Sequence, residues 1–212
     1  MKRRKVGNLL GLTLLVTLTE RPMYPYELAA TLRERGKDQS IKINWGSLYT
    51  VIQNLDKHGF IEAVETTREG GQPQRTVYRI TEAGQAEMND WLRELLGTPE
   101  REYPRFEAGL ADAGVLGPDA VIELLEQRLR LLDSDIADQR TALQGYLQTL
   151  PRLFVIEAEY HLAMCEAEAA WARGLLREMT DGTLPGIEEW RRYHQTGQTP
   201  PDFTGMLEAD QG

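Results

Sequence analysis

Residues 44–57 read NWGSLYTVIQNLDK, and this stretch decides the fold of the first half of the chain. A helix over residues 45–57 would gather its apolar side chains on one face, namely Leu48, Val51, Ile52 and Leu55. Asn44 is a favourable N-cap, and Gly59 stands just past the expected end of the helix. The stretch therefore predicts an amphipathic helix that packs on a core.

The opposite face of this helix carries groups suited to reading DNA. It holds Gly46, Thr50, Gln53 and Lys57, with Tyr49 and Asn54 on its flanks. Gln and Asn side chains can pair with base edges in the major groove, Lys can meet a phosphate, and Gly permits close approach. Taken alone, the same pattern also fits the solvated face of an ordinary amphipathic helix.

The residues that follow favour the first interpretation. Residues 60–65 and 76–80 have the composition of β-strands, and a segment with two glycines and a proline joins them. Arg68 and Arg75 lie in that segment. A β-hairpin with arginines at its tip, directly after such a helix, is typical of a wing that enters a minor groove or grips the DNA backbone.

The flanking sequence completes the domain. The leucine-rich run 6–18 suits a helix buried on several sides, and a short helix over 26–32 follows two prolines that end the first. On the other side of the hairpin, Thr81 caps a helix that ends at Gly97, and the apolar side of this helix carries Met88, Trp91, Leu92 and Leu95. We predict that residues 1–97 form a winged helix-turn-helix DNA-binding domain.

The second half reads as a helical domain. Residues 98–117 contain three glycines and two prolines, which predicts a connector. From Pro118 to Leu150, apolar residues then recur at intervals of three and four residues, as in a helix. A helix of that length is roughly 50 Å long and needs a partner. A second helix over 153–180 supplies one.

Residues 118–195, with a short third helix from Gly186, are therefore predicted to form an antiparallel helical dimerisation domain, followed by a mobile tail over 196–212. The alternative is a helical hairpin within a monomer. The predicted fold class is mostly α with a small β wing.

Charge divides along the same boundary. The chain has 212 residues and a net charge of −9, but residues 1–95 carry 14 Lys and Arg against 12 Asp and Glu. All of the acidic excess lies in the remainder, with 10 Lys and Arg against 21 Asp and Glu. Because DNA affinity depends on local cations rather than on total charge, the acidic half is expected to face away from the duplex.

Several function classes are not expected. The three histidines are far apart in the sequence and Cys165 is the only cysteine, so we predict no metal site, no cofactor and no disulfide. Neither a phosphate-binding glycine loop nor a nucleophile motif occurs, which argues against an enzyme. The apolar run 6–18 follows a basic arm but is too short to span a bilayer, so we expect a cytoplasmic protein without membrane contact.

The ordered motifs of the first 90 residues resemble the PadR family of bacterial transcriptional regulators. They are the run 9–18 followed by MYPYEL at 23–28, then GSLY at 46–49, GFI at 59–61 and YRITEAG at 78–84. The chain departs from the family pattern at Pro25, where members often have Gly, and at Trp45, which is bulky for the first turn of a recognition helix.

This resemblance implies a homodimer that binds an inverted-repeat operator, usually as a repressor. Carried over by position, the DNA contacts would come from Ser47, Tyr49, Gln53 and Lys57, with Arg68 and Arg75 in the wing. Family members often respond to small aromatic or hydrophobic compounds, and Trp91, Tyr103, Phe106 and Trp171 are the candidate lining residues. The same four fit a core or a dimer interface.

A second functional hypothesis stays open from the sequence. The chain could be a winged-helix protein-interaction module, in which the acidic helical half recruits a protein and the wing only stabilises the fold.

Overall fold

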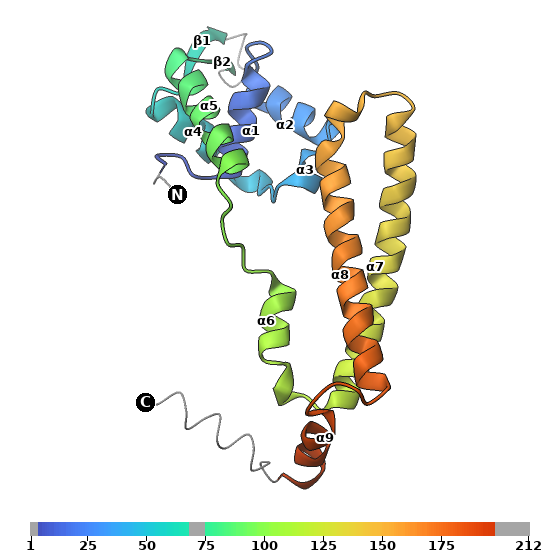
Figure 1. Cartoon of the computed structure of the whole chain (residues 1–212). Helices are drawn as coiled ribbons and strands as arrows, with labels where there is room; N and C mark the ends of the chain where they lie inside the picture. The colour runs from blue at the N-terminus through green and yellow to red at the C-terminus, as the bar shows by residue number, and fades with distance from the viewer. Residues whose placement is uncertain (1–3, 68–74, 198–212) are drawn as a thin grey trace. The chain divides into compact units, whose positions relative to one another are not determined.

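The computed structural model describes residues 4–67 and 75–197 and divides into two compact units, residues 1–101 and 102–212 (Figure 1). Both units are mainly helical, and the described β-structure is one two-stranded sheet in the first unit. This confirms the predicted fold class. Among the described helices, none combines the length and the apolar character needed to cross a membrane.

The first unit has the element order of a winged helix. Its elements are α1 (Leu9–Leu18), α2 (Pro25–Glu34), α3 (Lys37–Ser40), the 3-10 turn η1 (Trp45–Ser47), α4 (Leu48–Lys57), β1 (Ile61–Thr67), β2 (Arg75–Ile80) and α5 (Glu82–Gly97). Helix α1 begins three residues later than predicted, because the Asn8 side chain accepts a hydrogen bond from the Leu10 amide and caps it. The short α3 was not predicted.

One continuous apolar core holds these helices together. Helix α1 is buried on several sides, as its composition predicts, and the four apolar residues of the α4 inner face are all buried. From α5, Met88 and Trp91 join the same core. Leu95 was expected beside them but is exposed, because it lies in the last turn of α5, beyond the reach of the core.

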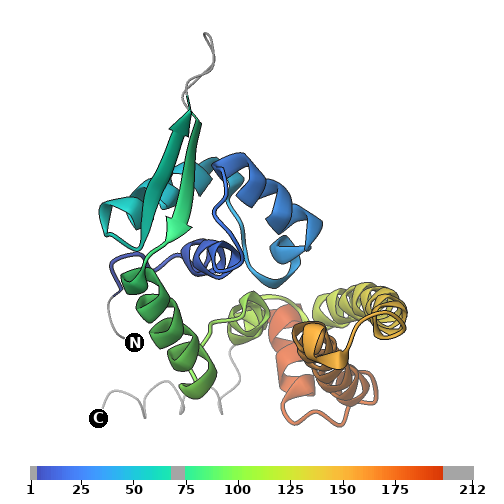
Figure 2. The same cartoon turned by 90° about the horizontal axis from the view of Figure 1, so that it is seen from above.

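The hairpin is antiparallel and is tied to the helices at its base. Ile61 pairs with Ile80, and the register shifts between Ala63 and Glu65. Figure 2 shows the two strands projecting away from the helices of this unit. Met23 and Tyr78 exchange two backbone hydrogen bonds of 3.0 Å, which add Met23, two residues before α2, to the edge of β2. The wing is thereby oriented by the helix-turn-helix itself.

A tight joint links the end of α4 to the start of α5. The Thr81 side chain caps α5 by accepting a bond of 3.0 Å from the Gly84 amide, and its hydroxyl donates to the Gly59 carbonyl at 2.6 Å. Gly59 itself has a φ of +71°, which favours glycine. Gly84 faces the Phe60 backbone so closely that a Cβ there would overlap the Phe60 carbonyl oxygen.

The basic arm before α1 is anchored on α5. The Arg4 guanidinium contacts Glu87 at 2.8 Å, Asp90 at 3.2 Å and also Glu94, and it lies 5.2 Å from the ring centre of Trp91. Only 2% of the Arg4 side chain is exposed. A single cation thus contacts three carboxylates along one side of the helix.

We expect Arg4→Ala to lower the free energy of unfolding by about 2 kcal/mol, because it removes a buried guanidinium that contacts three carboxylates. The loss is smaller than the roughly 3–5 kcal/mol of a fully buried pair, since the carboxylates keep partial contact with water. Urea unfolding monitored by circular dichroism measures it. Arg93→Ala, at an exposed position of the same helix, is the control, and equal losses in both variants would contradict the anchoring role.

The second unit is built on a long helical hairpin. Its elements are α6 (Arg105–Ala111), η2 (Ala113–Val115), α7 (Pro118–Leu147), η3 (Arg152–Phe154), α8 (Ile156–Thr180) and α9 (Ile187–Thr196). Helices α7 and α8 run antiparallel, side by side (Figure 1). Pro118 occupies the first turn of α7, as predicted. Within 98–117, which we predicted as a connector, the structure has the helical segments α6 and η2. Most of the predicted tail, residues 198–212, lies outside the described residues.

Two apolar clusters and three ion pairs hold α7 against α8. One cluster contains Val121, Leu125, Met179 and Ile187, and the other contains Leu129, Ile136, Ala169 and Ala172. The ion pairs bridge the two helices and join Arg128 to Glu168, Arg140 to Glu166, and Arg173 to Asp133. The small alanines allow close approach, while the ion pairs, which are partly exposed, add little stability of their own.

The end of the hairpin is different, because its apolar side chains are exposed. We call this surface the hairpin tip, and it comprises Tyr146, Leu147, Leu150, Leu153, Phe154, Ile156 and Tyr160. Phe154 is 64% exposed and Leu153 71%. An exposed apolar surface of this kind marks an interaction site in many soluble proteins.

Candidate nucleic-acid interface

The recognition-helix candidate is a continuous segment made of η1 and α4. The Asn44 side chain accepts a hydrogen bond of 3.1 Å from the Gly46 amide, which confirms its predicted capping role. The Asn44 carbonyl accepts from both the amide and the hydroxyl of Ser47, at 2.9 and 2.8 Å. These bonds tighten the first turn into a 3-10 turn, and α4 continues from Leu48.

The outer face of this segment matches the sequence prediction. Six predicted DNA-contact residues are exposed on it: Gly46, Tyr49, Thr50, Gln53, Asn54 and Lys57. Ser47, the seventh, is half-buried and its hydroxyl hydrogen is engaged in the cap. Tyr49 is 59% exposed, so it is not part of the core. The face therefore offers amide, hydroxyl and ammonium groups with no large aliphatic side chain among them.

Trp45 has a scaffolding role that the sequence did not reveal. Its ring packs against the core of the unit, and the Arg33 guanidinium from α2 lies 4.0 Å from the ring centre. This stacking places an exposed cation beside the first turn of the recognition-helix candidate. The sequence shows that a bulky residue, Trp45, stands in this turn. It does not show that Arg33 of another helix stacks on it.

The wing is described only in part. Arg68 lies outside the described residues, and Arg75 is the first residue of β2, with its side chain also outside them. Lower on the wing, Arg79 donates to Glu62 across the strands at 2.7 Å. The predicted contacts of both wing-tip arginines remain predictions.

Two titratable side chains of the first unit, Glu27 and Tyr78, have pKa values shifted away from neutral pH. The Glu27 carboxylate accepts from the Tyr24 amide at 2.8 Å and pairs with Arg21, and these bonds hold its pKa below the usual range. Burial, together with the charge of Asp56, raises the pKa of Tyr78. Glu27 thus stays charged and Tyr78 neutral around pH 7. The stabilisation from Glu27 is present at neutral pH and is lost as the pH falls through its lowered pKa.

The four predicted ligand-lining residues have different environments. Trp91 lies in the core of the first unit, and Tyr103 is exposed. Phe106 and Trp171, both in the second unit, meet edge to face with ring centres 6.0 Å apart. Arg128 lies over Phe106 at 3.7 Å. The structure thus pairs two of the four, and a ligand site at them remains a prediction.

Comparison with known proteins agrees with this geometry. Residues 14–90 match the family described as "Transcriptional regulator PadR-like family". The chain is similar in fold to Bacillus subtilis PadR in complex with operator DNA, with 19% identity, a TM-score of 0.64, and coverage of 80% of this chain and 98% of that one.

Two further structures show the same likeness. PadR from Bacillus subtilis in complex with p-coumaric acid matches with 17% identity, a TM-score of 0.65 and coverage of 80% and 97%. The PadR-like regulator BC1756 from Bacillus cereus matches with 16% identity, a TM-score of 0.54 and coverage of 80% and 96%. No curated protein matches the chain. The match over residues 14–90 agrees with the expectation that the chain is not an enzyme, since the family consists of regulators.

Proposed function

We propose that the protein is a homodimeric repressor that binds an inverted-repeat operator. The proposal starts from the match of residues 14–90 to the PadR-like family of transcriptional regulators. The observation that carries the proposal is the outer face of η1 and α4. Its polar groups are exposed while the opposite face is anchored in the core. A regulator of this kind works in the cytoplasm, where the DNA is.

The chemistry of this face supports major-groove recognition. Gln53 and Asn54 have amides that can bond to adenine edges, and Lys57 can reach a phosphate or a guanine. Gly46 and the small hydroxyl residue Thr50 leave room for close approach to the bases. The projecting hairpin would contact the adjacent backbone or minor groove through Arg68 and Arg75.

Dimerisation is proposed to occur through the helices of the second unit. The apolar side chains of the hairpin tip are 43–71% exposed within the described part of the chain, and a second copy would cover them. Two recognition helices in a symmetric dimer would lie about 34 Å apart and meet successive major grooves. A dimer would bind the two half-sites together, so its affinity for the operator would exceed that of one copy for one half-site.

We extend the proposal to a small aromatic effector. The fold is similar to that of a PadR solved with p-coumaric acid. In this chain, Phe106 and the half-exposed Trp171 provide an aromatic pair in the second unit, with the Arg128 guanidinium beside it. A small aromatic compound that released operator DNA would support this extension, and Trp171→Ala should weaken the response.

Variants of the reading face test the proposed contacts. Gln53→Ala should relax the preference at one base position of each half-site, at a cost of roughly 1–3 kcal/mol, because the amide would no longer discriminate the base edge. Fluorescence anisotropy with operator fragments substituted one position at a time measures this. Gln85→Ala, at an exposed position on α5, is the matched control. Unchanged preference in Gln53→Ala would show that this side chain does not read a base.

Lys57→Ala should behave differently. If Lys57 contacts a phosphate, its loss weakens binding to all sequences alike and lowers the slope of log K against log salt by about 1 for each half-site. The same anisotropy titration at several salt concentrations measures the slope. The protein-interaction alternative predicts that neither Lys57→Ala nor Gln53→Ala changes DNA binding, because no specific binding exists.

A further inference from the structure

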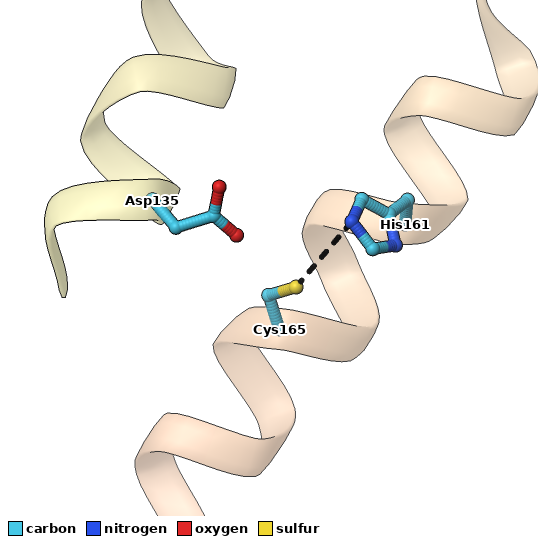
Figure 3. Close-up of side chains that lie close together, drawn as sticks. All are labelled: Asp135, His161 and Cys165. Carbon is cyan, nitrogen blue, oxygen red and sulfur yellow. Dashed lines mark hydrogen bonds between the residues drawn. The ribbon is translucent and has the colours of Figure 1, made fainter. Parts of the chain in front are cut away.

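The hairpin of the second unit brings together three metal-ligating side chains that lie far apart in the sequence. Asp135 comes from α7, and His161 and Cys165 come from α8 (Figure 3). Their ligand atoms, one from each side chain, all lie within 4.8 Å of one another. The cluster contains no DNA-contact candidate and no candidate effector residue.

The spacing of the cluster suits a metal ion. His161 and Cys165 are one helical turn apart on the same face of α8, the separation at which two residues of a helix can share one ion. The His161 Nε2 atom lies 3.9 Å from the Cys165 Sγ atom. Ligands of a tetrahedral zinc ion lie roughly 3.3–3.8 Å apart, given bonds of about 2.0–2.3 Å, so small side-chain rotations would complete the geometry.

The surrounding helices hold these ligands in place. Asp135 directly precedes Ile136, which is buried between the helices, and Cys165 packs against the same apolar cluster. Gln139 donates to the Asp135 carboxylate at 2.6 Å, and the same amide nitrogen is 3.8 Å from the Cys165 sulfur. Gln139 is thus a positioning residue that orients the carboxylate toward the cluster.

Asp135 also differs from three acidic residues that lie near it on this hairpin. Asp133, Glu166 and Glu168 are each paired with an arginine of the opposite helix. Within the described ranges 4–67 and 75–197, the structure gives Asp135 an amide partner and no arginine. Its negative charge is therefore available to a cation at the cluster, and the exposure of Asp135 and His161 leaves a path for the ion.

We propose that Asp135, His161 and Cys165 form a binding site for one divalent transition-metal ion per chain, of the Zn²⁺ class. A sulfur, an imidazole nitrogen and a carboxylate oxygen form a mixed donor set that suits Zn²⁺ and Co²⁺ rather than Mg²⁺ or Ca²⁺. Binding would release the thiol proton of Cys165 to solvent and leave the fourth position to water. The ion would join α7 to α8, so its release would loosen the hairpin.

The test uses the full chain, reduced, freed of any affinity tag and stripped of metal with a chelator. Titration with Co²⁺ should reach one ion per chain and produce a thiolate-to-cobalt band in the near ultraviolet. Competition with a chromophoric chelator then measures Zn²⁺ affinity. Cys165→Ser should abolish the cobalt band, and Asp135→Asn and His161→Ala should each weaken Zn²⁺ binding at least tenfold, because even residues outside the first shell contribute about 10–100-fold.

Asp138→Asn is the matched control, since it removes the same charge from an exposed position one turn further along α7 and should leave both readouts unchanged. Zn²⁺ should also raise the Tm of the wild type and of Asp138→Asn but not of Cys165→Ser. Because Asp135 is exposed, Asp135→Asn should fold normally. It therefore still tests the site if Cys165→Ser fails to fold. Three results would overturn the proposal. They are a wild type without a cobalt band, a stoichiometry of one ion per two chains, and a Zn²⁺ affinity that Asp135→Asn and His161→Ala leave unchanged.

Discussion

The variant Gly84→Ala is expected to destabilise the winged-helix unit by about 3 kcal/mol. Its added methyl group would overlap the Phe60 carbonyl oxygen and lie 2.9 Å from the Ile80 Cγ1 atom. The backbone of Phe60 cannot withdraw, because its amide bonds to the Leu55 carbonyl and its carbonyl accepts from the Thr81 amide. Overpacking against a fixed backbone costs about 1–3 kcal/mol or more, a large share of the stability of a small domain.

Thermal unfolding by circular dichroism measures this loss, and DNA binding should disappear with the fold of the unit. Gly97→Ala is the control on the same helix, because a Cβ at Gly97 has open space around it. Since Ala favours helix over Gly, this control should leave the Tm unchanged or slightly raised. If both variants had the same Tm as the wild type, the tight joint between α4 and α5 would be contradicted.

The second large effect is expected at the hairpin tip. Phe154→Glu places a charge on the proposed contact between two copies, and we expect it to convert the dimer to a monomer. Operator affinity should then fall by at least about a hundredfold, because joining two binding modules raises the affinity of one by about 10²–10⁴-fold. Sedimentation equilibrium measures the association, and anisotropy with the same operator fragment measures the affinity.

Gln148→Glu is its control, because it adds the same charge at an exposed polar position next to the tip without removing apolar surface. The control should remain a dimer. If Phe154→Glu also remained a dimer, another surface would have to join the two copies.

The part of the fold that could be predicted from the sequence rests on local patterns. The α4 inner face follows from helical spacing, the capping of η1 and α5 from Asn44 and Thr81, and the long hairpin from its leucine repeat. Helix α6 was not predicted, because seven residues with mixed polarity give no clear period. Leu95 was predicted on the apolar side of α5 but is exposed, because periodicity identifies the face of a helix and not the turn at which the core ends.

The candidate sites divide in the same way. The exposed groups of the reading face could be predicted because they lie on one helix. The contacts of Arg33 with Trp45, and of Arg4 with α5, could not, because each joins segments that are brought together only by folding. From the sequence we expected no metal site, because the three histidines are far apart. Folding brings Asp135 of α7 beside His161 and Cys165 of α8, and the metal site proposed there stays a prediction.

DNase I footprinting on the region upstream of the protein's own gene tests the central claim most directly. At moderate salt, a dimeric repressor should protect two symmetric half-sites whose centres lie about one DNA turn apart, at concentrations that leave unrelated DNA of equal length unprotected. Protection should disappear in Phe154→Glu and persist in Gln148→Glu. Equal affinity for unrelated DNA, or no protection of any site, would show that the protein is not an operator-specific repressor.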